Sequence, residues 1–427
     1  MQPRTGKTCG AQSTHTSSRL VLAAILPRKN RRPRGPGAEA SPGSADRTGT
    51  SAFRTTVRVG SNGPMRIETI ETFLADQIAI VRIRTDDGAE GIGQTSPFRP
   101  GLSVRLLHEM AAPHFLGQDP WDLEALVERC LRKEYKFPST FLYRALCGID
   151  TALWDLLGKV TGQPVHKLLG GQVRDFVPMY ASSMSRSITP EAEAERLAAL
   201  REEYGFRAAK VRIGDVMGAD RDASPGRTEK LIPHIREVMG DDFTIHADAN
   251  SGFSVSRAIR VGRILEDHGY GHFEEPCPYP LLENTAQVAA ALDIPVAGGE
   301  QDNSLVQFRR MIESHAVDIV QPDIGYIGGV ARARRVARMA EDAGIPCTPH
   351  CSNTSMLQVF TLHLAASMPA CHQFHEWGIE DTPWTRGVYE PELRLENGGV
   401  KVSTAPGWGV EITPEFLRDA HHEVSSR

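Results

Sequence analysis

The sequence lacks several features that define specialised classes of protein. Its seven cysteines are an odd number and include no Cys-x-x-Cys pair, which argues against a disulfide framework and against a cysteine zinc cluster. We therefore expect a reducing compartment and assign the protein to the cytoplasm. No apolar run approaches the length of a membrane span, so we expect no membrane insertion.

The chain also lacks an excess of positive charge. Its 427 residues carry a formal net charge of -5, which argues against a nucleic-acid partner. Residues 1–64 differ, because they hold 11 Lys and Arg against 2 Asp and Glu, and the remainder is therefore strongly acidic. A negatively charged body is compatible with a site that holds a cation.

Residues 1–64 have a composition unlike that of the rest of the chain. They are rich in Ser, Thr, Gly, Pro and Arg, as in "RKNRRPRGPGAEASPGSADRTGT", and such a sequence buries too little apolar surface to fold. We predict a disordered extension, or a chain whose real start is Met65. An export signal at Arg19–Pro27 and a transit peptide are weaker alternatives, since no clear cleavage site follows the short apolar run.

Regular patterns begin at Met65. Alternating apolar residues and the turn signal Asp86-Asp87-Gly88 predict antiparallel strands within residues 66–95, and helical spacing predicts a helix over residues 141–160. Beyond residue 177, short apolar strands alternate with amphipathic helices, as in parallel βαβ units. We predict strands near residues 177–184, 207–213, 243–249, 270–275, 294–298, 317–321, 345–349 and 371–376.

Seven or eight such units predict a barrel rather than an open sheet. We place an α+β domain at residues 65–176 and the barrel at residues 177–383. Residues 384–427 are strand-like and contain a Gly398-Gly399 turn, so we expect this segment to return to the first domain.

Acidic residues follow three consecutive predicted strands. Asp248, Glu274 and Glu300 stand at their ends with an equal spacing of 26 residues. The C-terminal ends of barrel strands share one rim, so these carboxylates should meet there, where they repel unless they are protonated or bind a cation. Turn or N-cap roles would explain any one of them, but not three in register. Oxygen ligands favour Mg²⁺ or Mn²⁺ over zinc, and we predict a metal site.

Candidate acid–base residues follow the other strands. Lys210 and Arg212 share one face of the second predicted strand, where Lys210 is a candidate base or carboxylate-binding residue. His350 follows the seventh strand and Asp323 the sixth, and a carboxylate beside an imidazole fixes its tautomer and raises its basicity. Glu376, on the eighth strand, is a candidate general acid or oxyanion donor.

In this order, these segments resemble the enolase superfamily and specifically its mandelate racemase subgroup. The resemblance covers Met65 to the C-terminus. It rests on "GIDTALWDLLGKVTGQPVHKLLGG", "KVR", "DAN", "EEP", "GGE", "QPDIGYIGG" and His350. It implies an α/β fold, with a modified (β/α)7β TIM-type barrel and an α+β N-terminal capping domain completed by the C-terminal segment. It also implies Mg²⁺, or alternatively Mn²⁺, at the three carboxylates.

The resemblance further implies abstraction of the proton α to a carboxylate, with the metal stabilising the enediolate. The partner is then a small-molecule carboxylate, and the family's habit predicts a homo-oligomer, a dimer or an octamer. One departure matters, because the subgroup commonly has Lys-x-Lys where this chain has Lys210-Val211-Arg212, and arginine is a poor base. We therefore expect one base, His350 with Asp323, and dehydration of a sugar acid (aldonate or aldarate) to a 2-keto-3-deoxy acid.

In this hypothesis Lys210, Arg212 and Glu376 stabilise the intermediate. Two alternatives stay open. A racemase, epimerase or cycloisomerase would need a second base on the opposite face, for which Lys210 is the candidate. A non-catalytic homologue would bind a metabolite or a protein partner.

A second departure lies in the cap. The link from Thr69 to Ile80 leaves little room for a loop that closes over substrate. We therefore expect Thr95–Gly101 or a neighbouring subunit to set specificity.

Overall fold

The computed structural model describes residues 64–137 and 140–427, all within one compact unit. The basic segment predicted to be disordered therefore lies outside the described residues, apart from Pro64. The predicted boundaries at residues 176 and 383 stay predictions, since they divide one unit. None of the helices in the described residues is long and apolar enough to span a membrane.

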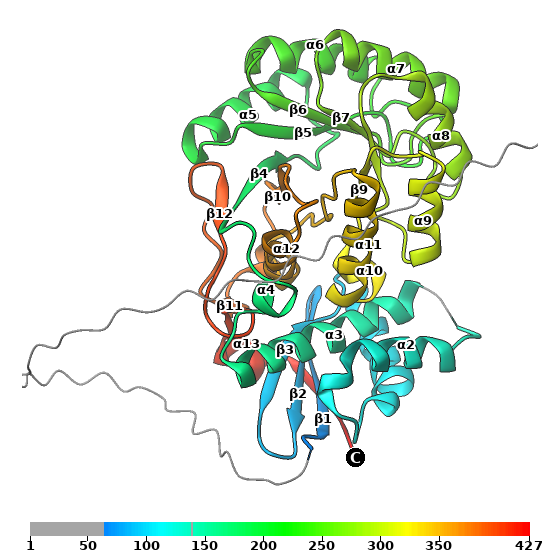
Figure 1. Cartoon of the computed structure of the whole chain (residues 1–427). Helices are drawn as coiled ribbons and strands as arrows, with labels where there is room; N and C mark the ends of the chain where they lie inside the picture. The colour runs from blue at the N-terminus through cyan, green and yellow to red at the C-terminus, as the bar shows by residue number, and fades with distance from the viewer. Residues whose placement is uncertain (1–63, 138–139) are drawn as a thin grey trace, which may run out of the picture. The chain divides into compact units, whose positions relative to one another are not determined.

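The N-terminal part is an antiparallel sheet covered by helices (Figure 1). Its strands are β1 (Ile67–Ala75), β2 (Ile78–Thr85) and β3 (Glu90–Gln94), and its helices are α1 (Pro100–Leu106), α2 (Leu123–Lys133), α3 (Thr140–Thr161) and the short α4 (Val165–Leu168). Only two residues join β1 to β2, which agrees with the short link expected between Thr69 and Ile80. Helix α3 extends the predicted 141–160 helix by one residue at each end, because its apolar side chains recur at helical spacing and are buried.

The barrel part is a curled parallel sheet with strand order β10-β4-β5-β6-β7-β8-β9. The strands are β4 (Phe176–Ser182), β5 (Ala208–Arg212), β6 (Thr244–Asp248), β7 (His272–Glu274), β8 (Val296–Gly298), β9 (Ile319–Val320) and β10 (His375–Gly378). The helices between them are α5 (Pro190–Tyr204), α6 (Arg227–Met239), α7 (Val255–Asp267), α8 (Leu282–Ala291), α9 (Leu305–Glu313), α10 (Ile324–Ile327), α11 (Val330–Ala343) and α12 (Met356–Ser367). Figure 1 shows α5 to α9 along the outside of the sheet. The predicted α/β fold with its cap is confirmed.

Two predicted strands differ from the observed ones. The strand expected at 345–349 is reduced to one bridge between Cys347 and Val320, because Pro346 and Pro349 have no N–H to extend a ladder. The strand expected at 371–376 is found at His375–Gly378, because the chain first turns out of α12, with the Cys371 N–H donating to the Met368 carbonyl at 3.1 Å.

The C-terminal segment contacts both parts. Strand β12 (Gly399–Lys401) pairs with β4 of the barrel, and β11 (Tyr389–Glu390) pairs with β13 (Glu411–Ile412). After α13 (Pro414–Asp419), β14 (His421–Ser426) pairs antiparallel with β1. The expected return of this segment to the capping sheet is confirmed.

Asp155 of α3 fastens the capping sheet and the C-terminal segment to the same helix. Its buried carboxylate accepts from the N–H of Ile92 at 2.9 Å and from the N–H of Trp408 at 2.8 Å, and it pairs with Lys159 at 2.9 Å. Burial raises the pKa of Asp155, and Lys159 and the two N–H donors partly offset that rise. One carboxylate therefore satisfies two buried backbone donors from distant parts of the chain.

We predict that Asp155→Ala destabilises the protein by about 3–5 kcal/mol, because it leaves two buried N–H groups without their acceptor and Lys159 paired with Glu411 alone. Asp155→Asn should cost less, since an amide oxygen still accepts one bond. Urea unfolding with Asp241→Ala, an exposed aspartate, as control measures the difference. A loss below about 1 kcal/mol for Asp155→Ala would refute this role.

Candidate active site

The structure brings the three predicted metal ligands together at one end of the sheet. Asp248 ends β6 and Glu274 ends β7, where the two are register neighbours, and Glu300 stands two residues beyond β8. One carboxylate oxygen from each lies within 4.8 Å of the others, and all three side chains are buried. The three residues that are equally spaced in the sequence therefore lie next to one another in space.

The loop after β6 orients the first of these carboxylates. Asn250 adopts a left-handed backbone conformation (φ 40°), and its N–H donates to Oδ1 of Asp248 at 2.7 Å. Gly252 is required there, because a side chain would meet the carbonyl oxygen of Asp215 at 2.7 Å and that of Ala249 at 2.8 Å. The turn after the strand therefore orients the carboxylate of Asp248 toward those of Glu274 and Glu300.

The donor set fits a hard divalent cation. All three ligands are carboxylate oxygens, the donors that Mg²⁺ and Mn²⁺ prefer. Oε2 of Glu300 is buried and has no hydrogen bond within the described residues, although Nε2 of His350 lies 3.4 Å away. Clustered buried carboxylates repel one another, and a cation between them removes that repulsion.

Lys210 lies inside the barrel against the same carboxylates. Its fully buried Nζ is 2.8 and 2.9 Å from the two oxygens of Glu274 and 3.1 Å from Oε1 of Glu376. Burial alone would lower the pKa of Lys210, but the two carboxylates outweigh burial and raise it above its ordinary value. In this arrangement Lys210 carries a positive charge, and its role as a base, which requires the neutral amine, stays a prediction.

Arg212 is a second fixed cation, two residues along β5. Its Nε donates to the carbonyl of Ser183 at 3.1 Å, its Nη1 donates to Oδ1 of Asn250 at 3.0 Å, and the same Nη1 contacts Asp248. A guanidinium stays protonated, so Arg212 offers charge and hydrogen bonds but takes no proton.

His350 and Asp323 form the predicted pair. Oδ1 of Asp323 accepts from the N–H of Tyr326 at the start of α10, and its Oδ2 lies 2.7 Å from Nδ1 of His350. This contact fixes the tautomer in which Nδ1 carries the proton. Burial alone would lower the pKa of His350, but Glu300, Glu376 and Asp323 outweigh burial and raise it to about 10.

Glu376 of β10 lies between Lys210 and His350. Its Oε1 accepts from Oγ of Ser182 at 2.7 Å, and its Oε2 accepts from the N–H of Cys351 at 3.1 Å. Burial alone would raise the pKa of Glu376, but Lys210 and His350 outweigh burial and lower it to about 2. An ionised carboxylate accepts hydrogen bonds, so this geometry supports an electrostatic role rather than the general-acid or oxyanion-donor role considered for it.

Gln321 is a site residue that the sequence interpretation missed. Its Nε2 donates to Oε2 of Glu274 at 2.9 Å from inside the barrel. Strand alternation contained the signal, because residues 321 and 323 share a face and Asp323 was already assigned to the site.

The cap meets the barrel beside His350. Gln94 at the end of β3 donates to Oγ of Ser355 at 3.0 Å and accepts from the N–H of Met356 at 3.1 Å. The next loop holds Phe98 in a left-handed conformation, half-exposed and edge-on to Trp384. This loop lies within Thr95–Gly101, the segment expected to set specificity.

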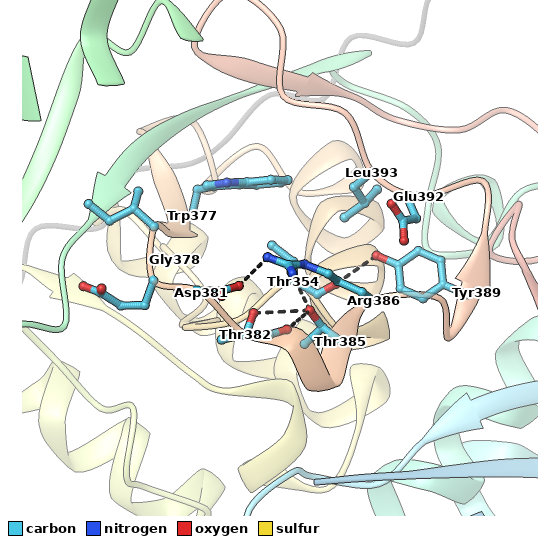
Figure 2. A pocket seen from close by; sticks show the side chains of 12 residues that line it. Thr354, Trp377, Gly378, Asp381, Thr382, Thr385, Arg386, Tyr389, Glu392 and Leu393 are labelled. Atoms are coloured by element: carbon cyan, nitrogen blue, oxygen red, sulfur yellow. Dashed lines mark hydrogen bonds and ion pairs between the residues drawn. The ribbon is translucent and has the colours of Figure 1, made fainter. Parts of the chain in front are cut away.

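A separate cavity of about 410 Å³ lies beside β10 (Figure 2). It is lined by Thr354, Trp377, Thr382, Thr385, Arg386, Tyr389 and others, and none of the eight predicted site residues lines it. Trp377 follows Glu376 directly, so strand alternation places the two side chains on opposite faces of β10. The carboxylate cluster and this cavity are therefore different places.

The fold and the site place the chain in a known family. Two family models match it: the mandelate racemase / muconate lactonizing enzyme N-terminal domain over residues 50–170, and the enolase C-terminal domain-like model over residues 192–416. The chain belongs to this family of the enolase superfamily.

Curated relatives are enzymes of sugar-acid metabolism. The chain is 31% identical to arabinonate dehydratase from Saccharolobus solfataricus over 348 residues, which cover 79% of this chain and 88% of the relative. It is also 31% identical to D-galactarolactone cycloisomerase from Agrobacterium fabrum over 353 residues, covering 80% and 90%. The relatives thus include a hydro-lyase and an isomerase.

Solved structures agree with the fold. A candidate racemase from Roseobacter denitrificans matches with a TM-score of 0.83 and 48% identity, covering 85% of this chain and all of that one. A mandelate racemase/muconate lactonizing protein from Paracoccus denitrificans, complexed with magnesium, matches with a TM-score of 0.79 and 31% identity, covering 85% and 98%. One solved structure with this fold is therefore a magnesium complex.

Proposed function

We propose that this protein dehydrates a sugar acid, an aldonate or an aldarate, to a 2-keto-3-deoxy acid and needs Mg²⁺ to do so. One observation carries the proposal. Asp323 and His350 flank the three carboxylates on one side, whereas the other side presents Lys210 and Arg212, each held as a cation. One base is enough for elimination of water. The dehydratase among the relatives supports the same reaction.

A divalent cation held by Asp248, Glu274 and Glu300 would neutralise the substrate carboxylate and the charge that builds on it when the α-proton leaves. Nε2 of His350 is the ring nitrogen that Asp323 leaves free, so this atom would take the α-proton once a cation at Glu300 offsets the negative charge that otherwise keeps the ring protonated. Asp323 then faces the imidazolium and stabilises its charge.

The same ring completes the elimination. His350 returns its proton to the β-hydroxyl, the C3–O bond breaks, and one water leaves. The resulting enol takes a proton at C3 and becomes the 2-keto-3-deoxy acid. Lys210 and Arg212 supply fixed positive charge beside the developing negative charge, and Glu376 keeps Lys210 in place.

Isomerisation is the second candidate, and the cycloisomerase among the relatives favours it. A racemase or epimerase needs a base on the face opposite His350, and that role would fall to Lys210. The contacts of Lys210 with Glu274 and Glu376 make it a poor proton acceptor, which is why dehydration is the first candidate.

A screen of aldonates and aldarates with Mg²⁺ tests the proposal. Mass spectrometry should show the loss of one water from at least one acid, with a product that reacts as an α-keto acid. If an isomerised acid forms without loss of water, the result would favour isomerisation over dehydration as the reaction. Tight binding of one acid with no turnover of any would revive the non-catalytic reading.

We predict that His350→Asn lowers turnover of the dehydrated acid by about 100- to 10,000-fold, because it removes the general base. His315→Asn is the matched control, since His315 is exposed and asparagine tolerates its left-handed backbone (φ 50°). Steady-state kinetics of both variants measure the effect. An unchanged rate in His350→Asn would exclude this role for His350.

We also predict that Mg²⁺ raises the thermal unfolding temperature of the wild type by several degrees and that EDTA reverses the rise, because binding stabilises the folded state. Glu300→Gln should need a higher Mg²⁺ concentration for the same rise, whereas Glu283→Gln, an exposed control on α8, should not. Absence of any Mg²⁺ effect on the wild type would contradict the metal assignment.

A further inference from the structure

Arg186 reaches across the ends of three barrel strands. It belongs to the loop after β4, its Nε donates to the carbonyl of Gly214 beyond β5 at 3.1 Å, and its Nη2 donates to Oδ1 of Asn250 beyond β6 at 2.8 Å. These two bonds fix the plane of a half-buried guanidinium at the end of the barrel that carries the site.

A single carboxamide group separates Arg186 from the proposed metal site. Oδ1 of Asn250 accepts from both Arg186 and Arg212, and Nδ2 of Asn250 donates to Oδ2 of Asp248 at 3.3 Å. The contacts from Arg186 to Asp248 therefore pass through one side chain, and Asp248 is a predicted ligand of the cation that would hold the reacting carboxylate. Glu300 is close enough to act on its charge.

Arg186 makes no direct ion pair within the described residues, although Asp215 and Glu300 lie close enough to act on its charge. Its two hydrogen bonds go to neutral oxygens, and its Nη1 is left without a bond in the same part of the chain. The neighbouring Arg227 is buried and bonded to backbone carbonyls, and it adds positive charge that Glu193 and Asp222 offset only in part. Burial, Arg212 and Arg227 together lower the pKa of Arg186 to about 10.

Arg212 provides the contrast. Its Nε, Nη1 and Nη2 are taken by the carbonyl of Ser183, by Asn250 together with Asp248, and by Sδ of Met184. Arg212 is thus occupied by the protein, whereas Arg186 keeps donors for a ligand.

We propose that Arg186 binds a second carboxylate of the substrate, at the end away from the reacting carboxylate, and that the preferred sugar acid is therefore a diacid. The inference rests on the proposed function. A fixed guanidinium pairs with a planar carboxylate through two parallel bonds, which a terminal hydroxymethyl group cannot form. An aldarate gains this pairing and the aldonate of the same hexose does not.

Matched aldonate and aldarate pairs test this specificity. The wild type should prefer the aldarate. Arg186→Gln should lower kcat/KM for the aldarate by about 10- to 100-fold, mainly through KM, and leave the aldonate within about threefold. Arg186→Lys should recover part of the loss. Arg221→Gln is the control. Arg221 is an exposed arginine in the neighbouring loop, and its substitution removes the same charge as Arg186→Gln does.

Three results would overturn the inference, and one of them also overturns the proposed function. Equal losses on both acids in Arg186→Gln and Arg186→Lys would mean that Arg186 only supports Asn250. Wild-type preference for the aldonate would refute the diacid while leaving the dehydratase in place. Wild-type turnover of no sugar acid would instead refute the proposed function, and the inference with it.

Discussion

Repulsion among buried carboxylates is the constraint on which this molecule depends. Asp248, Glu274 and Glu300 crowd one end of the barrel, and like charges interact strongly where water is scarce. The chain offsets them from one side with Lys210 and Arg212, and the remaining negative charge is what a divalent cation would neutralise. The same excess of charge raises the pKa of His350, so a cation held by the carboxylates would lower that pKa toward the range in which the ring accepts a proton.

Each part of the fold serves that cluster. Parallel register places Arg212, Asp248 and Glu274 side by side on three strands. The first turn of α10 orients Asp323 toward His350. Gln94 of β3 in the cap accepts a hydrogen bond from the segment that follows His350. The barrel supplies the charges, and the cap and C-terminal segment hold the neighbouring loops in place.

Much of this arrangement could be predicted, because a regular barrel converts sequence spacing into position. The ends of β6, β7 and β8 and the pairing of Asp323 with His350 follow from strand order and alternation. The partners of Lys210 could not be predicted, since Glu376 reaches it only when β10 closes beside β4. Gln321 was missed because a neutral amide is not among the residue types that suggest a ligand or an acid–base group, and Arg186 was missed because a loop arginine carries no distinctive spacing.

Turnover in D₂O tests the one-base account most directly, with NMR and mass spectrometry of both the product and the recovered substrate. The account predicts deuterium at C3 of the 2-keto-3-deoxy product and none at C2 of the recovered acid. Deuterium at C2 in both epimers of the recovered acid would contradict it, because the inverted epimer requires a second base opposite His350.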